Sequence, residues 1–290
     1  MTKQAVVVTG ASTGIGYAAA KRLADSGWQV WGGTRSGADA SKLERHDGVS
    51  SLRIEVTDES SLKMAFDEVG AKRGSAGLDL LIVNAGIVVG GPLEYVSQAD
   101  WRQQLDVNVV GVASSIRHAL PLLRTSGRSR IIVIGSINSR VGLPLLSPYA
   151  ASKHALVGLV SSLRQELGRD GPRITLIEPG AVQTPLWEKV ERASNDIFRS
   201  LPTEGQHEYG SFLERAITQT SETKRRGIHP DRVATVIEKC AGRRYPPRRR
   251  LVGRDARIAA MLTTLLPGRF FDLLVRRSRS VRISTQVTDG

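Results

Sequence analysis

The chain alternates short apolar runs with longer stretches in which apolar residues recur at helical spacing. Apolar runs without polar interruption are typical of strands buried on both faces of a sheet. They predict six strands, at Ala5–Val8, Gln29–Gly33, Leu52–Val56, Leu78–Val83, Arg130–Ile134 and Arg173–Glu178. The intervening stretches, several opened by Ser or Asp caps, predict helices over residues 17–26, 58–73, 98–123, 148–169 and 231–240.

This alternation predicts an α/β fold, a single doubly wound Rossmann domain with a mostly parallel sheet. Residues 185–227 break the rhythm, and we expect either a helical substrate lid or an extra helix pair packed on the domain. We assign residues 1–255, lid included, to a cofactor-binding catalytic domain. Residues 256–290 are expected to form a basic amphipathic C-terminal helical extension whose end can be disordered.

Positive charge is concentrated near the C-terminus. The chain has a net charge of +13, and residues 241–290 hold 12 arginines and 3 aspartates. The arginine clusters at 243–250 and 276–279 can be solvated surface or can bind anionic lipid or nucleic acid. No nucleic-acid-binding motif accompanies them, so nucleic acid is not expected, whereas peripheral membrane contact stays open. The apolar stretch 258–275 is interrupted by Pro267 and Asp272 and is not expected to span a bilayer.

The chain runs from Met1 directly into an apolar strand, without the pattern of a signal peptide. The single cysteine, Cys240, permits no intramolecular disulfide, which suits a reducing compartment. We therefore expect a cytoplasmic protein, with a peripheral position at a membrane surface as an alternative. The five histidines lack metal-ligand spacing, and no metal is expected.

A glycine-rich loop, Thr9 to Gly16, follows the first strand and opens the first helix. Glycines let the backbone approach a pyrophosphate, and the helix N-terminus favours its negative charge. The loop therefore predicts a dinucleotide site. The second strand ends in Thr34-Arg35-Ser36, where an NAD-preferring site would carry an acidic residue. Because a guanidinium pairs well with phosphate, Arg35 predicts NADP(H), unless it is only an exposed arginine.

Tyr149 and Lys153 lie four residues apart on one predicted helix, so both project to the same face. There the ammonium can favour the ionised phenol, and Tyr149 can exchange a proton with a substrate oxygen. Ser136, at the carboxyl end of the fifth strand, can hold the same oxygen. A second match to this spacing, Tyr17 and Lys21, lacks such a serine and is interpreted as structural packing.

These residues together resemble the short-chain dehydrogenase/reductase family. The resemblance covers residues 6–184 and rests on the glycine loop, Asn84-Ala85-Gly86, Asn108, Ser136, Tyr149 with Lys153, and the segment Pro179 to Thr184. It implies that Asn108 helps to hold a water for a proton relay through Lys153. It also implies that Asn84 and Gly86 shape the adenosine side of the site and that Pro179 to Thr184 cover the nicotinamide.

The chain departs from the family pattern after the third strand. It has Glu55-Val56 where the family usually has aspartate and valine against the adenine. With this substitution, the residues expected to contact cofactor are Gly10, Ser12, Thr13, Gly14, Ile15, Gly16, Thr34, Arg35, Ser36, Glu55, Val56, Asn84, Ala85, Gly86, Asn108, Tyr149, Lys153, Pro179, Gly180, Val182 and Thr184.

The overall pattern is similar to the branch with 17β-hydroxysteroid and retinol dehydrogenases. That similarity implies a lipophilic alcohol or carbonyl substrate, which the apolar residues Leu143, Leu145 and Leu146 would tolerate. It also implies a homodimer or homotetramer packed through the helices at 98–123 and 148–169.

Two functional hypotheses follow. The first is an NADP(H)-dependent oxidoreductase that interconverts an alcohol and its ketone or aldehyde, with Asn108, Ser136, Tyr149 and Lys153 as its catalytic residues. The second is a non-catalytic NADP(H)-binding sensor or scaffold whose basic tail contacts a membrane or a partner. The complete set of four catalytic residues favours the enzyme.

Overall fold

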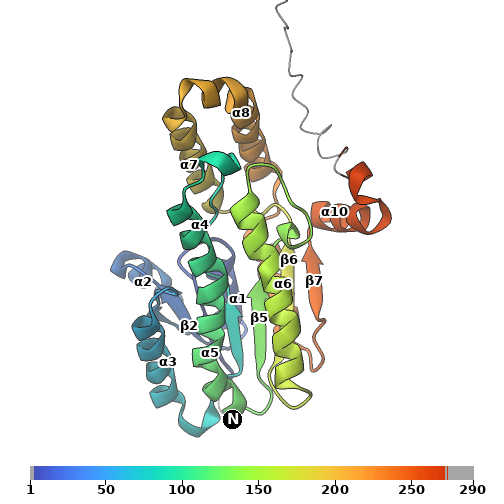
Figure 1. Cartoon of the computed structure of the whole chain (residues 1–290). Helices are drawn as coiled ribbons and strands as arrows, with labels where there is room; N and C mark the ends of the chain where they lie inside the picture. Colours follow the sequence, from blue (N-terminus) through green and yellow to red (C-terminus); the bar gives the residue numbers. More distant parts are fainter. Residues whose placement is uncertain (1–2, 272, 274–290) are drawn as a thin grey trace, which may run out of the picture.

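The computed structural model describes residues 3–271 and 273 and contains one parallel sheet covered by helices on both faces (Figure 1). The strand order is β3-β2-β1-β4-β5-β6-β7, and every pair of neighbouring strands is parallel. The strands are β1 (Ala5–Val8), β2 (Gln29–Thr34), β3 (Val49–Arg53), β4 (Leu80–Val83), β5 (Arg130–Ile134), β6 (Arg173–Pro179) and β7 (Arg249–Val252). The predicted doubly wound sheet is therefore confirmed.

Ten α-helices lie within the described residues. They are α1 (Gly14–Asp25), α2 (Gly37–Leu43), α3 (Glu59–Arg73), α4 (Gln98–Leu105), α5 (Gly111–Thr125), α6 (Ser147–Leu167), α7 (Leu186–Ser200), α8 (Thr203–Arg226), α9 (Pro230–Gly242) and α10 (Arg254–Leu265). In Figure 1, α7 and α8 stand together beyond one end of the sheet, and α10 lies beside its β7 edge.

Alternation along each strand divides the core into two layers. Val7 points to one face, where it packs in a cluster with Phe66 of α3, Ile116 of α5 and Leu156 of α6. Its neighbours Val6 and Val8 point to the other face and join a cluster formed with α1 and α9. Because both faces are covered, a ligand can bind at the edge formed by the carboxyl ends of the strands, between the paired strands β1 and β4, where the strand order reverses direction.

Some boundaries differ from those predicted. β3 covers Val49–Arg53, the residues that pair with β2, whereas Ile54 and Val56 are buried in the loop that follows. The predicted helix over 98–123 is divided by a π turn at Asp106–Val110.

Residues 185–227 form the helix pair α7 and α8, and α10 confirms a helical extension. Arg276, Arg277 and Arg279 lie outside the described residues. No helix among those described has the length and apolar character needed to cross a bilayer.

The sequence did not predict β7, because arginines occupy two of its four positions. The fully buried Glu178 of β6 accounts for one of these two arginines, Arg249. Its carboxylate accepts hydrogen bonds from Nε and Nη2 of Arg249, and from Nε of Arg140 at 3.1 Å and Nη2 at 2.9 Å. The buried negative charge is thereby paired on two sides, as a charge removed from water must be.

Removing Arg249 should therefore destabilise the fold. We expect Arg249→Met to lower the free energy of unfolding by about 2 kcal/mol, because one charged hydrogen-bond partner of buried Glu178 is lost while Arg140 remains. Urea unfolding followed by circular dichroism measures this change. The matched control is Arg250→Met, next along the strand and exposed, which should change stability by less than about 0.5 kcal/mol. Equal losses from the two variants would contradict the assigned role of Glu178.

Candidate active site

The glycine-rich loop joins β1 to α1 at the carboxyl edge of the sheet. Gly10 and Gly14 have positive φ angles of 64° and 59°, which favour glycine. A Cβ at Gly10 would lie 2.8 Å from the Cα of Ala85, and a Cβ at Gly16 would lie 2.2 Å from the carbonyl oxygen of Gly10. Glycines therefore permit this tight turn, which delivers the chain to the N-terminus of α1.

Asn84 ties the loop after β4 to the glycine loop. Its side-chain nitrogen donates hydrogen bonds to the carbonyl oxygens of Thr9 at 3.1 Å and Gly10 at 2.9 Å. In return, the buried hydroxyl of Thr9 accepts from the backbone N–H groups of Asn84 and Ala85. Asn84 thus sets the shape of the glycine loop. In the sequence, only the family resemblance pointed to a role for this residue.

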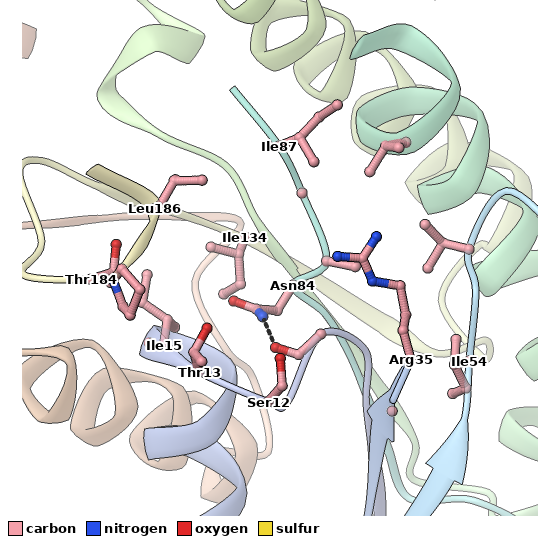
Figure 2. A pocket seen from close by; sticks show the side chains of 18 of the residues that line it. Ser12, Thr13, Ile15, Arg35, Ile54, Asn84, Ile87, Ile134, Thr184 and Leu186 are labelled. Carbon is pink, nitrogen blue, oxygen red and sulfur yellow. Dashed lines mark hydrogen bonds between the residues drawn. The ribbon is translucent and has the colours of Figure 1, made fainter. Parts of the chain in front are cut away.

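A groove runs along the ends of β1, β2 and β4 (Figure 2). Most of the residues expected to contact cofactor line it: Gly10, Ser12, Thr13, Gly14, Ile15, Thr34, Arg35, Glu55, Val56, Asn84, Ala85, Gly86, Tyr149, Lys153 and Thr184. The unpredicted lining includes Ile54, Ile87, Ile134 and Leu186. These apolar residues carry no chemical signal that sequence reasoning could have used.

The donors in this groove fit a dinucleotide phosphate. The glycine backbone and the start of α1 form its floor, Ser12 adds a hydroxyl, and Arg35 supplies a guanidinium (Figure 2). Nη1 of Arg35 lies 3.7 Å from Oε2 of Glu55, and both side chains are substantially exposed. An ion pair so exposed is weak, so Arg35 can exchange it for a phosphate at small cost.

Several expected contact residues lie elsewhere. Ser36 caps α2, where its hydroxyl accepts from the N–H of Asp39, and it is not among the groove residues. Gly16 packs against the carbonyl of Gly10 within the loop, and Asn108 is buried next to Gly86. Pro179, Gly180 and Val182 line a neighbouring apolar cavity instead.

Tyr149 and Lys153 lie on the first two turns of α6, next to the end of β5. Lys153 is 6% exposed, and its Nζ donates to the carbonyl oxygen of Ile134 at 3.1 Å. The same Nζ lies 5.6 Å from the centroid of the Tyr149 ring. Ser136 follows β5, and its hydroxyl accepts from the N–H of Asn138 at 3.1 Å. The three predicted side chains therefore converge, with Asn138 as an unpredicted neighbour that orients the serine.

Burial sets the acid–base properties of this cluster. Desolvation raises the pKa of Tyr149 above its ordinary value, and a hydrogen bond with Ser136 opposes that rise. Desolvation also lowers the pKa of Lys153 from 10.5 to about 8. In the protein alone, Tyr149 is thus held in its neutral form, the one that can donate a proton.

Asn108 lies in the π turn between α4 and α5 and joins three parts of the site. Its Oδ1 accepts from the N–H of Ile87 at 2.9 Å, while its Nδ2 donates to the carbonyl oxygen of Ile87 and to the hydroxyl of Ser152. π turns commonly occur at functional sites. The side chain of Asn108 therefore fixes the turn after Gly86 against α6, one residue from Lys153.

An apolar cavity of about 450 Å³ adjoins the cluster. Its walls include the loop before α6 and the helix pair α7 and α8, so this pair borders the cavity. The apolar lining includes Val88, Leu143, Leu145, Leu146, Leu186, Trp187, Val190 and Leu213. Ser136 and Tyr149 also line it, as does Asp255 of α10, which the sequence did not single out.

The second tyrosine–lysine pair is structural. The hydroxyl of Tyr17 lies 2.5 Å from Nε2 of His46, and exposed Lys21 pairs with Asp25. Neither residue lines the groove or the apolar cavity. Within the described part of the chain, no group of three or more His, Cys, Asp or Glu residues could hold a metal ion.

Comparison with known proteins agrees with this geometry. Residues 4–195 match the sequence profile described as short chain dehydrogenase. The uncharacterized oxidoreductase YusZ of Bacillus subtilis is 32% identical, over 96% of this chain and 99% of its own. A 3-ketodihydrosphingosine reductase of Bacteroides thetaiotaomicron is 30% identical, over 87% and 89%. The crystal structure of a short chain dehydrogenase/reductase from Burkholderia phymatum in complex with NAD is also similar. Its TM-score is 0.76 at 25% identity, covering 94% of this chain and 95% of that one.

The buried lysine makes a prediction about stability. We expect Lys153→Met to raise the free energy of unfolding at pH 7 by about 2 kcal/mol, because burial disfavours the charged ammonium. The folded-state pKa, about 8, is below the unfolded-state value of 10.5, so the penalty is complete below pH 8 and disappears as the pH approaches 10.5. Urea unfolding at pH 7 and pH 10 measures the difference.

The control for this experiment is Lys21→Met, which removes an exposed lysine at the corresponding position of the other pair. It should show no comparable stabilisation at either pH. A Lys153→Met variant that is less stable than the wild type at pH 7 would show that burial does not penalise this ammonium.

Proposed function

The chain belongs to the short chain dehydrogenase family, and from that premise we propose that it is an NADP(H)-dependent oxidoreductase that interconverts an alcohol and its ketone or aldehyde on a lipophilic substrate. One observation carries the proposal: Tyr149 lines both the dinucleotide groove and the apolar cavity. Its hydroxyl stands at the junction where a substrate oxygen would meet a cofactor. Among the relatives, the 3-ketodihydrosphingosine reductase acts on a ketone, which is consistent with this chemistry.

In the direction of reduction, Tyr149 gives its proton to the carbonyl oxygen of the substrate. The Ser136 hydroxyl, positioned by Asn138, hydrogen-bonds the same oxygen as negative charge develops on it. The ammonium of Lys153, held by the carbonyl of Ile134, favours the phenolate that remains. A nicotinamide bound in the groove would supply the hydride, or accept it in the reverse reaction. The hydrogen bonds of the Asn108 side chain hold the turn after Gly86 against α6.

Lipophilicity of the substrate is supported by the cavity. The cavity of about 450 Å³ is lined mostly by apolar residues and glycines, so most polar groups of a strongly hydrated substrate would lose water without gaining a hydrogen-bond partner. The helices α7 and α8 contribute Leu186, Trp187, Val190 and Leu213, so the lid determines much of the shape of this cavity.

The preference for NADP(H) rests on Arg35. The structurally similar protein from Burkholderia phymatum is in complex with NAD, so similarity of fold does not by itself indicate NADP(H). Arg35 lies in the groove at the end of β2, in the place where an acidic residue would otherwise bind the ribose 2′-hydroxyl. A guanidinium there favours a 2′-phosphate.

We further propose a cytoplasmic homodimer or homotetramer that associates through α4, α5 and α6. The exposed apolar side chain of Val110, between α4 and α5, supports this surface. The single cysteine, Cys240, is buried and needs no oxidising compartment.

Tyr149→Phe tests the catalytic assignment. We expect kcat for carbonyl reduction to fall by about 10²–10⁴-fold, because the proton donor is removed while the ring and the groove remain. Steady-state NADPH consumption with a panel of lipophilic ketones measures the rate, and isothermal titration calorimetry measures cofactor binding. Tyr17→Phe is the control and should retain full activity. If wild type and Tyr149→Phe are equally inert and both bind NADPH, the chain is a cofactor-binding sensor or scaffold.

Arg35→Asp tests the coenzyme assignment. We expect the dissociation constant for NADPH to rise by about 10–100-fold and that for NADH to change by less than about threefold, because only NADPH carries the 2′-phosphate. Arg53→Asp makes the same change of charge at an exposed arginine outside the groove and should leave the preference intact. An unchanged ratio of the two dissociation constants in Arg35→Asp refutes the role of Arg35.

A further inference from the structure

A second hollow, of about 600 Å³, lies apart from Tyr149 at the β7 edge of the sheet. Five arginines line it, and a single carboxylate accompanies them: Arg226, Arg232, Arg250, Arg254, Arg257 and Asp255. We refer to this space, with its five arginine side chains, as the arginine hollow. Its residues come from the end of α8, the first turn of α9, the strand β7 and the first turn of α10.

The fold explains why these arginines converge. Along β7, Arg249 turns to Glu178, so the next residue, Arg250, projects to the opposite face and into the hollow. Arg254 and Arg257 are three residues apart and share one face of α10. Arg232 occupies α9 beside Val233, which is buried against the core. Side chains spread over more than 30 positions of the chain are thus collected around one space.

The charges of these guanidinium groups are not balanced by ion pairs with described residues. In the part of the chain that the structure describes, none of the five forms an ion pair with a carboxylate. By contrast, Arg22, Arg73 and Arg249 pair with Glu238, Asp79 and Glu178. The lining carboxylate, Asp255, instead accepts a hydrogen bond from the N–H of Ala181 at 2.7 Å. Five unpaired cations around one hollow repel one another, and an anion relieves that repulsion.

The backbone adds to the positive potential. Helices α9 and α10 both begin at the hollow, with Pro230 and Arg254 as their first residues, and the N-terminal end of a helix carries partial positive charge. Guanidinium groups offer paired N–H donors whose geometry matches phosphate oxygens. Because several cations face one space, the hollow favours a multiply charged oxyanion such as a phosphate group over a singly charged anion.

We infer that the arginine hollow binds a phosphate-bearing ligand, through Arg226, Arg232, Arg250, Arg254 and Arg257. The phosphate can belong to a soluble phosphate ester or to the headgroup of an anionic phospholipid. Ala181 and Asp255 line both the hollow and the apolar cavity. A phosphate bound here thus contacts the same segment that borders the substrate cavity, although binding does not depend on catalysis.

Two ligands distinguish the sources, both applied to the full chain. Isothermal titration calorimetry with pyrophosphate tests the soluble source, with NADP+ present in excess to occupy any phosphate site in the groove. Co-sedimentation with vesicles of phosphatidylglycerol and phosphatidylcholine, compared with vesicles of phosphatidylcholine alone, tests the lipid source. We expect binding in at least one arm. Binding of pyrophosphate alone assigns a soluble ligand, and binding of vesicles alone assigns a lipid headgroup.

The test variant combines Arg232→Ser, Arg254→Ser and Arg257→Ser. The matched control combines Arg124→Ser, Arg128→Ser and Arg169→Ser, three exposed arginines near the amino-terminal ends of β5 and β6, so that both variants lose the same charge. We expect the test variant to weaken binding by at least about tenfold and the control by less than about twofold. The single variant Arg232→Lys, which keeps the charge but loses the paired donors, should show an intermediate loss.

Two results overturn the inference. The first is an absence of binding in both arms by the wild-type chain. The second is an equal loss of binding in the test variant and the charge-matched control, which would assign the attraction to net charge rather than to the hollow. Circular dichroism and thermal unfolding of each variant confirm that the chain remains folded.

Discussion

The buried carboxylate of Glu178 holds together parts of the molecule that would otherwise be independent. It lies at the end of β6, and its two partners come from different segments: Arg140 follows the turn that begins at Ser136, and Arg249 opens β7. One charge removed from water therefore fixes the serine of the site, the last strand and the helix that follows it. The apolar cavity and the arginine hollow both depend on this connection, because residues beyond β7 line each of them.

The site combines groups that stability alone would not select. Lys153 is a buried ammonium whose contacts within the protein include one carbonyl oxygen and the face of a phenol ring. Leu145, in the wall of the cavity, has a φ angle of 63°, an unfavourable value for a branched side chain. Lys153 lines the groove and Leu145 lines the cavity. Such costs are tolerated when a rigid scaffold imposes them, and the two-layered core provides that scaffold.

The sequence predicted the features that depend on local pattern. Continuous apolar runs such as Leu80–Val83 identify central strands, and the spacing of Tyr149 and Lys153 places both on one face of a helix. Features that depend on partners distant in sequence were missed. β7 reads as a charged segment until Glu178 is known to be its partner, and β3 was misplaced because only two of its five residues are buried, which weakens its apolar pattern. The lining of the arginine hollow is likewise invisible in sequence, since its arginines come from four separate elements.

The two outer strands of the sheet also determine how copies of this chain can meet. β7 is four residues long, follows Pro246 and Pro247, and exposes Arg250, while β3 at the other edge exposes Ser50 and Arg53. Short, charged and proline-flanked edges discourage a strand from another molecule from joining the backbone ladder. The seven-stranded sheet is therefore a closed unit with respect to strand addition. Crowding of newly made chains should favour helix-mediated association over the edge-to-edge pairing that leads to fibrillar aggregates.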